Sequence, residues 1–183
     1  GEAQARAEQS VSLGGDTQAK ARAIYERVLA DVDYSKTVPG WGQGDLSYVC
    51  RVGKGNCSDF HALFVSMARS QQIPALFEIG FPLPLDKKEG AVGGYHCWAW
   101  FFLPGEGWVP VDISEAWKHP ERRDYFFGNL DPDRVALTVG RDIVFPGMNG
   151  PPVNLFFAPY VEIDGAPFKG ATLTTSFTDL DPV

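Results

Sequence analysis

The 183-residue sequence has few of the residues that build disulfide frameworks, metal clusters or membrane spans. It contains only three cysteines and three histidines. An odd number of cysteines leaves at most one intramolecular disulfide, which excludes a disulfide-stapled scaffold. No apolar run approaches the roughly 20 residues that a helix needs to cross a bilayer, so we expect no membrane span in this chain.

Basic residues are also scarce. The chain has 16 Lys and Arg against 23 Asp and Glu, and its formal net charge is −7 at pH 7. Binding to nucleic-acid phosphates relies on clustered Lys and Arg, whereas basic residues here are scattered and form no run longer than a pair. We therefore expect no nucleic-acid partner.

The composition is otherwise that of a folded protein. Hydrophobic residues make up 44% of the sequence and aromatic residues 13%, which indicates a globular chain with a substantial core. The sequence begins without methionine and without a signal-peptide pattern, so we expect it to be part of a longer gene product.

Sequence periodicity predicts helices first and strands afterwards. Helices are expected over 17–31, capped by Asp16, and over 57–70, with a weaker helical stretch at 115–130; residues 34–55 are glycine-rich and read as irregular. Strands are expected at 75–81, 95–103 and 108–113, the last two as a hairpin, and within "RVALTV", "NLFFAPYVEI" and "TLTTSF". The pattern predicts an α+β fold. We expect a lead-in segment (1–15) and a single domain (16–183) with a strand-rich C-terminal extension (131–183).

Cys57 occupies a position that favours reactivity. It follows the glycine-containing turn "GKGN" and begins the best predicted helix. Unpaired N–H groups at a helix N-terminus stabilise negative charge and so lower the pKa of a thiol. The same donors can bind the oxyanion of an acyl-transfer transition state.

Two further residues complete a nucleophilic site. His96 begins one strand of the predicted hairpin, and Asp112 lies near the end of the next. A hairpin places such positions side by side, so the two can form an imidazole–carboxylate pair that serves the thiol. Each residue also has a simpler interpretation: Cys57 as a buried apolar residue, His96 as a core histidine, and Asp112 as a cap for the following turn. The joint arrangement favours catalysis.

The segments "GNCSDFHALFVSMARSQQIPALFEIGF" and "GYHCWAWFFLPGEGWVPVDISEAW" resemble the transglutaminase-like superfamily of papain-type cysteine enzymes. The similarity covers roughly residues 41–117 and includes a cysteine at the head of a helix, an "H-x-W" strand and a "W-V-x-V-D" strand. The chain departs from the family pattern at Trp100, where an acidic residue is common, and at Gln72, where glycine is usual.

The resemblance implies a papain-like core in which N-terminal helices, including the nucleophile helix, pack on an antiparallel sheet. It implies Cys57 as nucleophile, His96 as general base and acid, and Asp112 as the carboxylate that orients the imidazole. Trp41, Gln43 and Ser58 are candidates for oxyanion or substrate binding. Asp59, in the first helical turn, is expected to stabilise the helix start.

A metal site is the weaker alternative. His61 lies four residues after Cys57, and Cys50, His96 and Cys97 add further soft ligands, but no Cys-x-x-Cys pair is present. His96 and Cys97 are adjacent and should point to opposite faces of a strand. We expect no metal and no cofactor; a disulfide between Cys50 and Cys97 is left open.

The resemblance implies acyl transfer on peptide or protein amides through a thioester, resolved by water or by an amine. The alternative is a catalytically silent binding or scaffolding module with the same fold. Bacterial relatives of this type are often exported, which favours a periplasmic, secreted or cell-envelope location over a cytoplasmic one.

Overall fold

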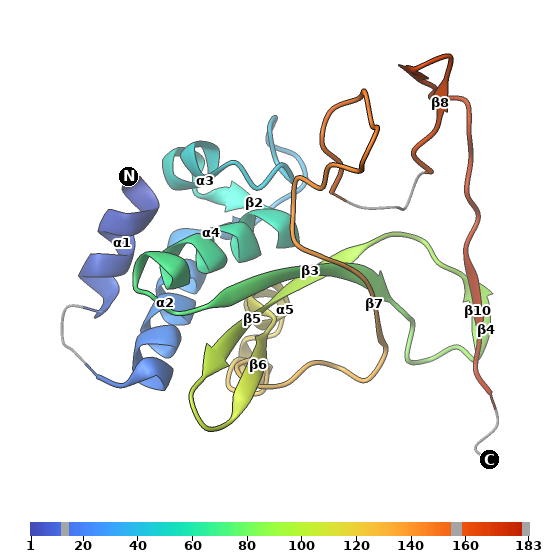
Figure 1. Ribbon diagram of the computed structural model, residues 1–183. Coiled ribbons are helices and arrows are strands. Elements are labelled where there is room, and N and C mark those ends of the chain that lie inside the picture. The colour runs from blue at the N-terminus through green and yellow to red at the C-terminus, as the bar shows by residue number, and fades with distance from the viewer. Residues whose placement is uncertain (12–14, 155–158, 181–183) are drawn as a thin grey trace. The chain divides into compact units, whose positions relative to one another are not determined.

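The computed structural model describes residues 1–11, 15–154 and 159–180 and divides into two compact units. Unit 1 comprises Gly1–Phe77 and Cys97–Leu130, and unit 2 comprises Glu78–His96 and Asp131–Val183. Figure 1 labels the helices and strands of both units.

Unit 1 holds the helices of the protein's described part. They are α1 (Glu2–Val11), α2 (Thr17–Asp31), α3 (Leu46–Val52), α4 (Cys57–Ser70), α5 (Ile113–Lys118) and a 3₁₀ turn, η1 (Pro120–Arg122). The predicted helices at 17–31 and 57–70 are confirmed with the same bounds. Asp16 caps α2 by accepting a hydrogen bond from the Ala19 amide at 2.8 Å.

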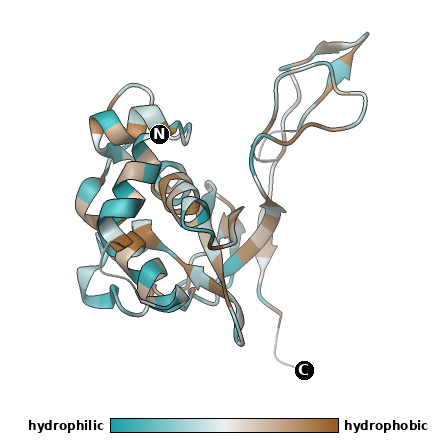
Figure 2. Cartoon of the chain, turned by 60° about the vertical axis from the view of Figure 1, so that its left-hand side comes forward, coloured by the Kyte–Doolittle hydropathy of each residue, from teal (hydrophilic) through white to brown (hydrophobic). Residues whose placement is uncertain are grey.

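Helix α4 is the centre of unit 1. It contacts α1, α2, α3 and α5, and every residue from Cys57 to Val65 is buried. Phe60, Leu63 and Phe64 are fully buried, and each such side chain stabilises the fold by about 1.5–3 kcal/mol. The other helices carry alternating hydrophilic and hydrophobic bands, as expected for helices with one buried face (Figure 2).

Unit 1 also contains strands. The hairpin of β5 (His96–Leu103) and β6 (Gly107–Val111) is antiparallel, with Ala99 opposite Val111, and this confirms the predicted hairpin. Strand β3 (Ala75–Pro82) is the next strand beside β5, and two short strands, β1 (Asp33–Tyr34) and β2 (Lys54–Gly55), pair in parallel. The α+β class is therefore confirmed.

The glycine-rich stretch at 34–55 is more regular than predicted. Helix α3 occupies its second half, and Asp45 caps it by accepting hydrogen bonds from the Ser47 and Tyr48 amides. Gly53 ends it with a left-handed φ of 64°. The cap and the terminating glycine are recognisable signals, but the helix has only seven residues and is too short to show clear periodicity.

Unit 2 consists of short strands. The second half of β3, from Glu78, pairs antiparallel with β7 (Arg134–Val139), which confirms the strand predicted at "RVALTV". The remaining pairs are β4 (Glu89–Ala91) with β10 (Ser176–Thr178), and β8 (Glu162–Ile163) with β9 (Ala166–Pro167). Part of the predicted strand "NLFFAPYVEI", residues 155–158, lies outside the described residues. Across the described chain, no helix combines the length and apolarity needed to cross a membrane.

Candidate active site

Cys57 is the first residue of α4 and is 3% exposed. The side chain of the preceding residue, Asn56, caps the helix by accepting a hydrogen bond from the Ser58 amide at 2.9 Å. Asp59 completes a reciprocal capping box, since its carboxylate accepts a hydrogen bond from the Asn56 amide at 2.9 Å. The thiol is thus fixed at the positive end of a well-capped 14-residue helix.

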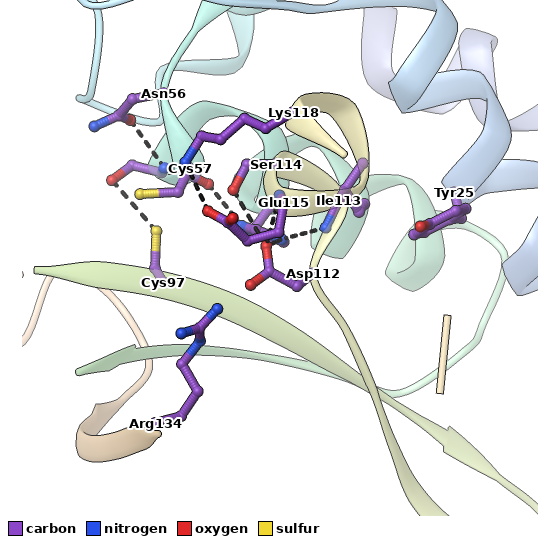
Figure 3. Close-up of polar contacts among 12 residues, drawn as sticks. Tyr25, Asn56, Cys57, Cys97, Asp112, Ile113, Ser114, Glu115, Lys118 and Arg134 are labelled. Carbon is purple, nitrogen blue, oxygen red and sulfur yellow. Dashed lines mark hydrogen bonds and ion pairs between the residues drawn. The ribbon is translucent and has the colours of Figure 1, made fainter. Parts of the chain in front are cut away.

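Asp112 is fully buried and caps α5. Its Oδ1 accepts hydrogen bonds from the Ser114 hydroxyl at 3.2 Å and from the Glu115 amide at 3.1 Å, and Figure 3 shows these contacts around the start of the helix. The capping role considered from the sequence is therefore present. A cap also fixes the orientation of the carboxylate, so capping and a catalytic role are compatible.

His61 joins the two helices that carry these residues. Its Nδ1 lies 2.7 Å from the Cys57 carbonyl oxygen, and its Nε2 accepts a hydrogen bond from the Ile113 amide at 2.9 Å. Since Nε2 accepts, Nδ1 carries the proton and the ring is neutral. Nε2 is 3.8 Å from Asp112 Oδ1, too far for a hydrogen bond. His61 therefore connects the backbone at Cys57 to the residue after Asp112.

The sequence alone suggests His61 only as a metal ligand. The spacing of four residues from Cys57 was the available signal, but it reflects a contact with the Cys57 carbonyl one turn back along the helix. Within the described residues, no three His, Cys, Asp or Glu side chains are grouped as a metal site.

His96 is the first residue of β5 and is 5% exposed. It ends the segment Glu78–His96 of unit 2, and the next residue, Cys97, begins the second segment of unit 1. The pairing of the His96 imidazole with Cys57 and Asp112 stays a prediction.

Cys97 is a neighbour of Cys57 that the sequence did not reveal. It is fully buried, and its thiol donates a hydrogen bond to the Ser58 hydroxyl at 3.7 Å. In Figure 3 the Cys97 side chain points toward the sulfur of Cys57. Burial, followed by the hydrogen bond with the Cys57 thiol, raises the pKa of Cys97 well above its ordinary value. Cys97 therefore stays a protonated thiol beside Cys57.

The third cysteine, Cys50, lies in α3. Burial raises the pKa of its thiol as well, and its carbonyl accepts a hydrogen bond from Arg6. All three cysteines lie in the described part of the chain, and none of them forms a disulfide, so the Cys50–Cys97 bond left open by the sequence is absent.

The three candidates for oxyanion or substrate binding differ in exposure. Trp41 is partly buried, Gln43 is exposed, and Ser58 is buried. The Ser58 amide donates to the Asn56 cap, and the Ser58 hydroxyl accepts from Cys97. Trp41 and Gln43 belong to one loop. The Gly42 and Gly44 amides of this loop donate hydrogen bonds to Asp59 in the first turn of α4.

Comparisons with known proteins bear on the family and the fold of this chain. The sequence pattern of the transglutaminase-like superfamily matches residues 4–113. An uncharacterized protein of Haemophilus influenzae is 32% identical over 192 residues, an alignment that covers 86% of this chain and 52% of the relative. The chain thus spans about half the length of that relative.

Two solved structures have a similar fold. A candidate cysteine protease from Cytophaga hutchinsonii has a TM-score of 0.55 at 19% identity, over 75% of this chain and 41% of that one. The periplasmic domain of TgpA from Pseudomonas aeruginosa has a TM-score of 0.50 at 23% identity, over 66% and 44% of the two chains. With the helix-start cysteine, the buried aspartate and the confirmed hairpin, the family match shows that this chain belongs to the transglutaminase-like superfamily.

Proposed function

We propose that the protein is a cysteine-dependent enzyme that transfers acyl groups from peptide or protein amides through a thioester on Cys57. The observation that carries the proposal is the position of Cys57 at the capped N-terminus of α4. The backbone dipoles there stabilise a thiolate and, later, an oxyanion.

The proposed reaction has two halves. His96 accepts the thiol proton, and the thiolate attacks the amide carbonyl carbon to give a tetrahedral oxyanion. The C–N bond then breaks, and the amine leaves with the proton from His96. The remaining thioester is attacked by water or by an amine, which gives up a proton to His96. The C–S bond then breaks, and the leaving thiolate takes this proton back from His96, which regenerates Cys57.

The other site residues have supporting roles in this proposal. Asp112 orients the His96 imidazole and stabilises its protonated form. Backbone N–H groups at the start of α4, together with Gln43 or Trp41, stabilise the oxyanion. Water as acceptor makes the enzyme a protease or amidase, and a lysine amine makes it a cross-linker.

The relatives support a location and a substrate class. The similar domain of TgpA is periplasmic, and the similar Cytophaga protein is a candidate cysteine protease. We accordingly propose that this chain acts outside the cytoplasm, as a periplasmic, secreted or cell-envelope protein, with peptides or proteins as substrates.

Trapping the acyl-enzyme tests the proposal. The protein is incubated with p-nitrophenyl acetate, or with a blocked glutamine-containing peptide, each with and without an alkylamine, and the modified residue is mapped by mass spectrometry. We expect an acyl group on Cys57, formed at least about 100-fold faster than on the same cysteine in the urea-unfolded chain. Amine incorporation identifies a transferase, and peptide hydrolysis identifies a hydrolase.

The matched thiol in this experiment is Cys50, whose raised pKa predicts little acylation at neutral pH. If folded and unfolded Cys57 acylate at the same rate and neither peptide product forms, the result contradicts the proposed enzyme and supports a binding or scaffolding module.

A further inference from the structure

Asp59 holds a loop as well as a helix start. Its carboxylate is fully buried and accepts three backbone hydrogen bonds: from Gly42 at 2.6 Å, from Gly44 at 2.9 Å and from Asn56 at 2.9 Å. The Asn56 bond belongs to the capping box, but the other two cross to a segment 15–17 residues earlier in the chain. Helix capping alone requires neither of them.

Because this loop is rich in glycine, it needs contacts from outside the loop to hold it in one conformation. Gly40, Gly42 and Gly44 all have positive φ values, of 96°, 80° and 60°. Glycine adopts this region readily, but it also has the largest conformational entropy to lose when it is fixed. Two hydrogen bonds to a buried carboxylate, each stronger than a neutral pair, offset that loss.

Close packing brings the loop against the nucleophile helix. A Cβ atom added to Gly42 would lie 3.3 Å from Asn56 Nδ2, and a Cβ added to Gly55 would overlap the Asp59 carboxylate. The absence of a side chain at Gly55 leaves room for the Asp59 carboxylate, and its absence at Gly42 lets the loop pack against the Asn56 cap. Gln43, between the two anchored residues, keeps an exposed side chain.

We infer that Asp59 is a positioning residue that fixes the Gln43 loop relative to Cys57, so that Gln43 is the side-chain donor to the oxyanion. The inference rests on the proposed function and adds to it a choice between Gln43 and Trp41. Asp59 itself touches no reacting atom. It accepts hydrogen bonds from Gly42 and Gly44, the residues on either side of Gln43. Since Asp59 lies two residues after Cys57 in the first turn of α4, these bonds connect the Gln43 loop to the part of the helix that carries Cys57.

Two reactions of the same sulfur separate this role from a purely structural one. Acylation by p-nitrophenyl acetate passes through an oxyanion, whereas alkylation by iodoacetamide displaces iodide and forms none. In Asp59→Asn, one of the two accepting oxygens becomes an NH₂ group. Because Gly42 and Gly44 donate to different oxygens, one of these two loop amides loses its acceptor. We expect acylation of Cys57 to fall about 100-fold, as for loss of one oxyanion donor, while its alkylation rate stays within about twofold.

Two further variants complete the test. Gln43→Ala removes the proposed donor at an exposed position and should lower acylation to a similar extent without affecting folding. Asp45→Asn makes the same charge change two residues away on an exposed helix cap, and since Asn caps helices as well as Asp, it should leave both rates unchanged.

The outcomes distinguish the positioning role of Asp59 from the proposed acyl-enzyme on Cys57. Equal loss of acylation and alkylation in Asp59→Asn, or full acylation in Gln43→Ala, would overturn the positioning role while the acyl-enzyme on Cys57 still stands. If Asp59→Asn does not fold, the Gln43→Ala result decides. A wild-type protein that forms no acyl-enzyme would remove both proposals.

Discussion

Replacing Cys57 by alanine is expected to lower acyl transfer by at least about 10⁴-fold, measured as release of p-nitrophenolate and as loss of the acyl-enzyme mass. The thioester cannot form without the sulfur, so the residual rate reflects the solvent reaction alone. The change removes one atom from a residue that is 3% exposed, at a helix start whose capping box involves Asn56 and Asp59 rather than Cys57. Folding should therefore be retained.

Cys50→Ala is the matched control for this variant. It removes a thiol that is also buried, but from α3, and should change the rate by less than about twofold. A Cys57→Ala protein that keeps its acyl-transfer rate, or a Cys50→Ala protein that loses it, would show that another group is the nucleophile.

Asp112→Asn should lower acylation by about 10²- to 10⁴-fold while leaving stability almost unchanged. The carboxylate has two roles in this account, as the cap of α5 and as the partner of His96. Asparagine keeps the oxygen that accepts from Ser114 and Glu115, and it caps helices about as well as aspartate. It removes only the negative charge that stabilises protonated His96. Urea unfolding and acylation kinetics on one sample measure the two effects.

Asp112→Ala provides the comparison, since it removes the cap and the charge together and should lose about 1 kcal/mol of unfolding free energy as well as activity. If Asp112 only caps the helix, Asp112→Asn would acylate at the wild-type rate, and this result would contradict its catalytic assignment.

The parts of the fold that sequence reasoning predicted are those with strong local signals. Helix α4 combines a polar cap, apolar residues at helical spacing and a stop before Pro74, and its predicted bounds are correct. The β5–β6 hairpin has two apolar strands joined by a glycine-containing turn. Such signals arise from neighbours in the chain, so one sequence suffices to read them.

The features that were missed depend on contacts between distant residues. His61 in α4 accepts a hydrogen bond from the Ile113 amide, 52 positions later in the chain. The Cys97 thiol donates a hydrogen bond to Ser58, 39 positions earlier. Strand alternation placed His96 and Cys97 on opposite faces but did not indicate which helix Cys97 would face. Tertiary packing determines that, and no local pattern encodes it.

One departure from the family pattern has a structural counterpart. Gln72, where the family pattern described in the sequence analysis has glycine, adopts a φ of 61° just after α4, in the left-handed region that favours glycine. Gln72 therefore adopts a backbone conformation that glycine would accommodate with less strain. Trp100 lies in β5 opposite Pro110 and is partly buried, so this departure falls within the confirmed hairpin.

The ionisation of Cys57 is the claim on which the whole account depends, and its alkylation rate against pH measures it most directly. Iodoacetamide is applied from pH 5 to 9, and each cysteine is quantified by mass spectrometry in the wild type and in His96→Ala. We predict that Cys57 reacts at pH 6 nearly as fast as at pH 8 and slows in the His96 variant. Cys50 and Cys97 have raised pKa values, so they stay protonated and unmodified until the pH exceeds the ordinary thiol value. A Cys57 rate that instead climbs about tenfold per pH unit toward an ordinary pKa of about 8.5, in both proteins alike, would contradict the account.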